Sequence, residues 1–121
     1  MKSLSEDAVI VTNLGVVLLR QGMASDAIEF FEFASRMEPG QAGYHVNLAA
    51  AYTATGSVDR AILELEQSLT IDPSLGAAYH RLIDIFSQNN KAALRRTLQR
   101  YLAVAPGDIK TRIALRQLDG K

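Results

Sequence analysis

The chain has 121 residues, of which 48% are apolar and 21% are charged, and this fits one globular domain rather than a disordered segment. It contains no cysteine, which excludes disulfides, thiolate metal sites and cysteine nucleophiles. The net charge is zero, but residues 1–75 hold ten acids and four bases, whereas residues 76–121 hold three acids and nine bases. Such a charge split indicates two surfaces of opposite sign.

An apolar stretch over residues 8–19 follows the acidic pair Glu6 and Asp7 and ends at Arg20. A secretory signal has a basic start and a small-residue cleavage site, neither of which is present here. The stretch is also shorter than the roughly 20 apolar residues that span a bilayer. We therefore expect a cytoplasmic protein with no membrane partner.

The apolar landmarks recur at one fixed shift along the chain, so that Leu14 falls on Leu48 and Leu82. A constant shift of this size indicates an internal repeat of helix pairs. The third unit is one residue shorter, and we place the missing residue between Asn90 and Leu94. The sequence therefore predicts one domain over 1–121, with repeats at about residues 8–41, 42–75 and 76–108.

Each repeat is expected to form two helices joined by a short turn. Gly22 and Gly56 suit a turn that needs a positive φ, and Asn90 takes that place in the third repeat. A proline ends each second helix because it cannot continue one. Helix pairs are predicted near 8–37, 42–70 and 76–103, with a capping helix over 109–118 after the N-cap Asp108.

These landmarks resemble the signature of the tetratricopeptide repeat (TPR) family, in which each repeat carries an apolar residue, Leu-Gly, an aromatic residue, Ala, Phe and Pro in that order. The first repeat supplies Val11, Leu14, Gly15, Leu18, Gly22, Ala27, Phe31, Ala34 and Pro39. The second supplies His45, Leu48, Ala49, Tyr52, Gly56, Ala61, Leu65, Ser68 and Pro73. The third is degenerate, with Leu94, Leu98 and Tyr101 where Ala, Phe and Ala are expected. The resemblance implies an all-α solenoid of three repeats plus a C-terminal capping helix.

The resemblance also implies a concave groove, lined by the first helix of each repeat, that binds a peptide or helix of a partner protein. Its expected lining is Val9, Thr12, Asn13, Val16, Val46, Asn47, Ala50, His80, Arg81 and Asp84. Asn13, Asn47 and Arg81 recur at the repeat shift. A side-chain amide offers a donor and an acceptor to a peptide backbone, as in the similar asparagine ladder of O-GlcNAc transferases. The alternative is that the amides bind a neighbouring helix or water.

Another groove known in the family is the carboxylate clamp, in which two Lys, two Asn and one Arg bind the acidic C-terminus of heat-shock chaperones. Asn47 and Arg81 match two of its five positions. The remaining three hold Thr12, Val16 and Ala77, whose side chains cannot pair with a carboxylate. We therefore expect no carboxylate clamp in this chain.

The sequence shows no Ser–His–Asp pattern, Gly-rich phosphate loop or HExxH motif, so we expect neither an enzyme nor a cofactor or metal site. His45 is expected to be a satisfied core residue, and His80 a solvent-facing one. The basic residues between Lys91 and Arg116 have only Tyr101 as an aromatic neighbour. This pattern favours a solvated surface over a nucleic-acid interface.

The stretch over 8–19 contains only two polar residues, Thr12 and Asn13. A helix that is apolar all round is normally buried, and three explanations stay open: a partner or second copy covers it, more protein precedes it, or the groove is hydrophobic. The leading interpretation is an adaptor or scaffold that binds a partner protein. The alternative is a structural element that self-associates, as a weak homodimer, or docks within a larger assembly or enzyme.

Overall fold

The computed structural model describes residues 4–120, with side chains from residue 6 onward. These residues form seven helices and no strand, which confirms the predicted all-α fold. The helices are α1 (Leu4–Arg20), α2 (Ala24–Met37), α3 (Ala42–Ala54), α4 (Val58–Ile71), α5 (Gly76–Phe86), α6 (Lys91–Val104) and α7 (Ile109–Leu118). They divide into two compact units: unit 1 ends at Asp72 and unit 2 begins at Pro73.

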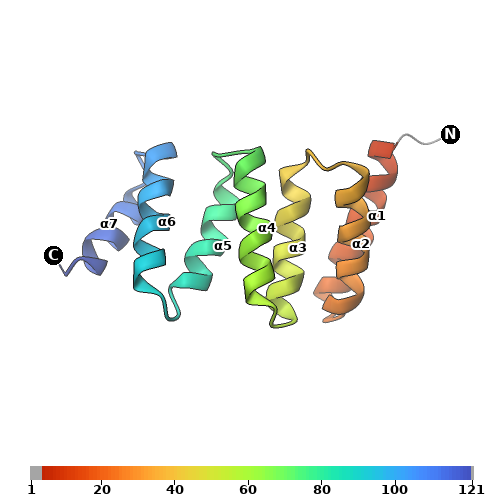
Figure 1. Cartoon of the computed structure of the whole chain (residues 1–121), viewed down its shortest axis with the longest axis horizontal. Coiled ribbons are helices and arrows are strands. Elements are labelled where there is room, and N and C mark those ends of the chain that lie inside the picture. The colour runs from red at the N-terminus through yellow and green to blue at the C-terminus, as the bar shows by residue number, and fades with distance from the viewer. Residues whose placement is uncertain (1–3, 121) are drawn as a thin grey trace. The chain divides into compact units, whose positions relative to one another are not determined.

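In unit 1 each helix packs against the next helix along the chain, from α1 to α4 (Figure 1). The turns inside the two helix pairs carry Gly22 at φ +81° and Gly56 at φ +85°, which confirms the predicted left-handed glycines. Phe31 of α2 and Leu65 of α4 are 1% and 0% exposed. Both lie near the middle of the second helix of their pair, and each removes a large apolar side chain from water.

The close approach of α1 and α2 depends on Gly15. A Cβ atom on Gly15 would lie 2.6 Å from Cε1 of Phe31, which is closer than van der Waals contact allows. Phe31 is almost wholly buried, so its ring has little room to move away. A residue without a side chain at position 15 therefore lets the two helices meet over the Phe31 ring.

We expect Gly15→Ala to lower the free energy of unfolding by about 1–2 kcal/mol, because overpacking against Phe31 outweighs the gain in helix propensity. The control is Gly43→Ala in α3, where an added Cβ meets no atom within 4 Å. That change should stabilise the helix by up to about 1 kcal/mol. Urea unfolding followed by circular dichroism measures both, and a stabilising Gly15→Ala would contradict the packing argument.

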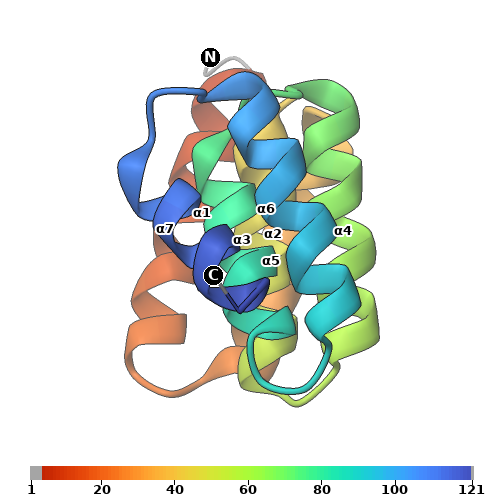
Figure 2. The same cartoon turned by 90° about the vertical axis from the view of Figure 1, so that its left-hand side faces the viewer.

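In unit 2, α5 packs on α6, and the chain then turns back so that α7 lies beside α6 (Figure 2). The Tyr79 hydroxyl of α5 donates a hydrogen bond of 2.7 Å to the carbonyl of Pro73. Its ring stacks on that of Tyr101 of α6 at 5.2 Å between centroids. These contacts fix the start of α5 against the end of α6. The predicted capping helix over 109–118 coincides with α7.

Two details of the third repeat differ from the sequence-based expectation. Asn90 does not take the left-handed place of glycine, because its φ is −136° and its side chain caps α6 by accepting a hydrogen bond of 3.0 Å from the Ala93 amide. The missing residue also lies before Asn90 and not between Asn90 and Leu94. The α5 helix starts one full repeat after α3, whereas Asn90, the N-cap of α6, already stands one position short of a full repeat after Ser57, the N-cap of α4. An asparagine N-cap ends the turn without a positive φ.

The buried side of α6 is correspondingly different from the one expected. Ala93 and Thr97 are 4% and 2% exposed, while Leu94 and Tyr101 are only half-buried. The small Ala93, rather than the residue after it, therefore allows the close contact inside this unit. The larger side chains of Leu94 and Tyr101 remain available to line the surface of unit 2.

Candidate partner-binding faces

The predicted groove residues of unit 1 come from α1 and α3, which are in contact with each other as well as with α2. On α1 they follow the spacing i, i+3, i+4, i+7, which places them on one side of the helix. Thr12, Val46 and Ala50 are each 9% exposed, so they offer little surface to a ligand and mainly hold the two helices together. Val9 and Asn13 are exposed, and Val16 and Asn47 are half-buried; these four form the accessible part, named here the amide face.

The amide face presents two carboxamides that are not used inside the fold. Within residues 4–120, neither Asn13 nor Asn47 makes a side-chain hydrogen bond to another residue. The donors and acceptors of both amides thus remain available. Beside them, the Thr12 hydroxyl is buried and has no hydrogen-bond partner among the described residues. A buried hydroxyl without a partner costs folding free energy.

In unit 2 the three predicted residues His80, Arg81 and Asp84 are all exposed on α5. The His80 ring meets the edge of the Tyr101 ring at 5.3 Å between centroids, which holds the imidazole toward α6. Arg81 and Asp84 form no ion pair with another residue in the described part of the chain. These positions therefore offer one cation, one anion and one imidazole to solvent.

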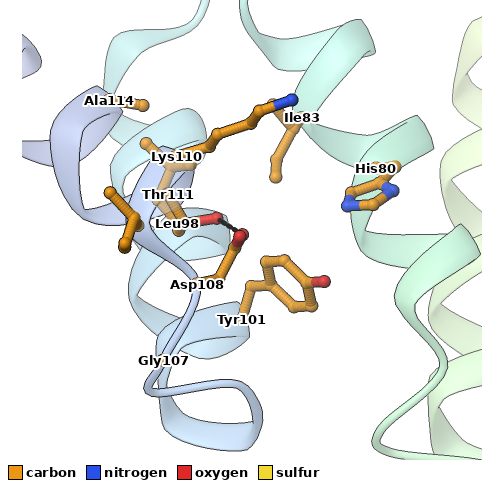
Figure 3. Close-up of a pocket in the computed structure, with 10 residues that line it drawn as sticks. His80, Ile83, Leu98, Tyr101, Gly107, Asp108, Lys110, Thr111 and Ala114 are labelled. Atoms are coloured by element: carbon orange, nitrogen blue, oxygen red, sulfur yellow. Dashed lines mark hydrogen bonds between the residues drawn. The ribbon is translucent and has the colours of Figure 1, made fainter.

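An open pocket of about 670 Å³ lies in unit 2 beside His80 (Figure 3). It is lined by His80, Ile83, Leu98, Tyr101, Gly107, Asp108, Ile109, Lys110, Thr111 and Ala114. Apolar side chains and the Tyr101 ring make up most of this lining, and Lys110 extends from α7 toward α5 (Figure 3). Such a pocket can hold one bulky apolar side chain with an acidic group near Lys110.

Sequence reasoning named His80 but missed the rest of this pocket. The available signal was Tyr101, a large ring at a repeat position where alanine is expected. Asp108 is the residue before α7, as predicted, but its carboxylate accepts a hydrogen bond from the Thr111 hydroxyl and caps no backbone amide. The Asp108 charge is thereby engaged, and Lys110 is left as the cation at the pocket's edge.

The second histidine belongs to the packing of unit 1, as predicted. His45 of α3 is half-buried, and its Nδ1 lies 2.7 Å from Oε2 of Glu64 in α4. In the described part of the chain, no three His, Asp or Glu side chains gather where they could hold a metal ion. Among residues 4–120, no helix is both long and apolar enough to cross a membrane.

The comparison with known families agrees with this architecture. A family model described as "Tetratricopeptide repeat" matches residues 18–85, which is more than half of the chain and includes both helices of the second repeat. The chain belongs to the tetratricopeptide repeat family. Its TPR repeats have the helix-pair design expected from the sequence. The first helices α1 and α3 carry the amide face, and the first helix α5 carries the exposed polar residues of unit 2.

Similar TPR proteins are found among curated sequences and solved structures. "Inactive TPR repeat-containing thioredoxin TTL3" of Arabidopsis thaliana is 33% identical over 79 residues, covering 65% of this chain and 11% of that protein. The chain thus spans about a tenth of that relative's length. The "Arabidopsis OM64 TPR domain" has a TM-score of 0.79 at 18% identity, covering 96% of this chain and 97% of that one.

Another similar structure is described as "First TPR of Spaghetti (RPAP3) bound to HSP90 peptide SRMEEVD". It has a TM-score of 0.79 at 20% identity and covers 96% of this chain and 95% of its own. At such low identity the likeness shows a shared TPR fold and nothing finer. The side chains that this TPR chain presents must therefore be judged from its own residues.

Proposed function

We propose that the chain is a TPR adaptor that binds a peptide or helix of a partner protein, with no catalytic role. The observation that carries this proposal is the pair of accessible amides, Asn13 and Asn47, at the same position of two successive first helices. Amides at a repeating position can pair with a peptide backbone whatever its side chains are. Val9 and Val16 border the amides with apolar surface, so that backbone pairing and apolar contact can act together.

In unit 2 the same function is served by the exposed residues of α5 and the pocket beside them. The pocket would take a bulky apolar side chain, and Lys110 would favour an acidic residue next to it. Unit 2 is rich in basic residues, and complementary charge accelerates and orients association more than it adds affinity. An acidic partner segment with one large apolar residue is therefore the ligand that we propose for unit 2.

The HSP90 peptide of the similar structure is not the ligand that we propose here. Thr12, Val16 and Ala77 occupy three of the clamp positions and carry no charge, so a C-terminal carboxylate would find no lysine there. Arg81 would be the one cation left at the clamp positions, and a single cation offsets less of the desolvation cost of a carboxylate than the three cations of the clamp do. The peptide SRMEEVD thus serves as a discriminating probe, and we expect no measurable binding by isothermal titration.

The positive test is a selection from a random-peptide library displayed on phage, with the whole chain as bait. A synthetic peptide that the wild type enriches should bind Asn13→Ala/Asn47→Ala about tenfold more weakly, because each lost hydrogen bond is worth about 0.5–1.5 kcal/mol. The matched control is Asn89→Ala, which changes an exposed asparagine in the turn before α6. Equal affinity of the double variant and the control would reject the amide face as the site.

A further inference from the structure

The side of α1 next to the amide face carries three large apolar residues. Ile10, Leu14 and Val17 are 40%, 49% and 50% exposed, and their spacing of four and three residues places them in one row along the helix. We name this row the outer face of α1. It is distinct from the amide face, because Val9, Asn13 and Val16 lie in the neighbouring row.

The internal repeat shows what such a face does when a helix covers it. One repeat further along the chain, Leu14 and Val17 correspond to Leu48 and Ala51 of α3, which are 3% and 0% exposed. In unit 1, α3 packs against the preceding helix α2. The same positions that are buried on α3 are thus left open on α1, although their side chains are as apolar.

The charges on α1 indicate which helix would cover this face. The first turn of α1 carries Glu6 and Asp7, and the last turn carries Arg20. An antiparallel copy of α1 would place the basic end of one helix beside the acidic end of the other. A parallel copy would instead bring like charges together at both ends, which is unfavourable.

The apolar row fits the same antiparallel register as the charges. The midpoint between Ile10 and Val17 and the midpoint between Asp7 and Arg20 both fall between Asn13 and Leu14. A twofold axis at that point sets Ile10 of one copy against Val17 of the other. It brings Leu14 close to its own counterpart, as a self-complementary interface requires.

We propose that the outer face of α1 is a self-association surface, on which α1 of a second copy packs antiparallel. The contact is one helix wide and falls short of the roughly 800 Å² per partner of a standard interface. The dimer should therefore be weak, with a dissociation constant on the order of 100 µM. Because the amide face lies on the neighbouring row, self-association and peptide binding can be tested separately.

The first experiment uses the absence of cysteine from the chain. Leu14→Cys introduces one thiol near the twofold axis, so mild oxidation of the protein at about 0.5 mM, above the expected dissociation constant, should give a covalent dimer. The control Leu63→Cys places a thiol on α4 at a leucine that is 69% exposed, and it should cross-link far less. A different outcome would overturn the proposal in favour of head-to-tail assembly: neither Leu14→Cys nor Ile109→Cys cross-links alone, but a mixture of the two proteins does.

The second experiment measures association by sedimentation equilibrium. Arg20→Glu should weaken the dimer about tenfold by turning attraction into repulsion at both ends of the helix pair, and Arg20→Glu with Glu6→Lys and Asp7→Lys should restore it. A charge reversal that is not restored, or a wild-type protein that stays monomeric at about 0.5 mM and low salt, would overturn the proposal.

Leu14→Glu should abolish association, and Leu63→Glu should leave it unchanged. Circular dichroism of each variant shows whether the helices persist. If Leu14→Glu does not fold, the cysteine and charge-reversal variants still decide the question. Asn47→Ala, which changes α3 and leaves α1 intact, should dimerise normally, so that loss of peptide binding and loss of self-association point to different faces.

Discussion

Replacing Phe31 by alanine is expected to lower the free energy of unfolding by about 3–5 kcal/mol. The Phe31 ring is 1% exposed and lies against Gly15 of α1, where an added Cβ would come within 2.6 Å of it. Because Gly15 has no side chain, position 15 contributes no atoms that could fill the space that the ring leaves. The cavity therefore stays largely open, and its cost adds to the lost burial of the ring.

Phe33→Ala is the matched control for this prediction, since it makes the same change two residues along the same helix. Phe33 is 48% exposed, so its removal should cost less than about 1 kcal/mol. Urea unfolding at a few micromolar protein, well below the dissociation constant proposed for self-association, measures both variants. Similar losses at the two positions would mean that the α1–α2 contact does not centre on Phe31.

The repeat, the helix pairs and the family could be predicted because their signals are local in the sequence. Leucine, glycine and proline at a fixed shift act through helical periodicity, turn geometry and helix termination. Asn90 was misjudged because asparagine suits both a left-handed turn residue and an N-cap. Choosing between these roles requires the position of the α6 start, which the sequence does not mark.

The candidate sites were predictable only in part, for a different reason. The repeat shift places Asn13 and Asn47 at equivalent positions of two first helices, and this could be predicted. The burial of Thr12 could not be predicted, because it depends on helices that are distant in the sequence. Leu14 illustrates the same limit. It repeats the buried Leu48 in sequence, yet it is 49% exposed, because burial at this position requires a preceding helix that α3 has and α1 lacks among the described residues.

The pocket of unit 2 was beyond sequence reasoning because three helices and a connecting loop build it together. His80 comes from α5, Tyr101 from α6 and Lys110 from α7. No spacing in the sequence brings these residues to one place. Of these three residues, only Tyr101 departs from the repeat pattern, because it places a large ring where an alanine is expected.

Leu65→Ala should lower the free energy of unfolding by about 2–5 kcal/mol, whereas Leu63→Ala should change it by less than about 0.5 kcal/mol. Leu65 is 0% exposed on α4 and Leu63 is 69% exposed on the same helix, so the two variants differ only in whether the lost atoms were buried. The free energies of unfolding of the two variants are measured in urea, and their difference reports what the burial of Leu65 contributes to the α3–α4 contact. Equal losses of stability in the two variants would show that Leu65 is not part of the core.

Comparing Leu65→Ala with Asn47→Ala separates stability from binding. A peptide that occupies the amide face binds only the folded chain, and it therefore stabilises Leu65→Ala by mass action. At saturating peptide, Leu65→Ala should gain as much free energy of unfolding as the wild type does, while Asn47→Ala should gain less despite an unchanged stability without peptide. If Leu65→Ala lost affinity when fully folded, and Asn47→Ala kept it, binding would depend on the packing of α3 and α4 and not on the exposed amides.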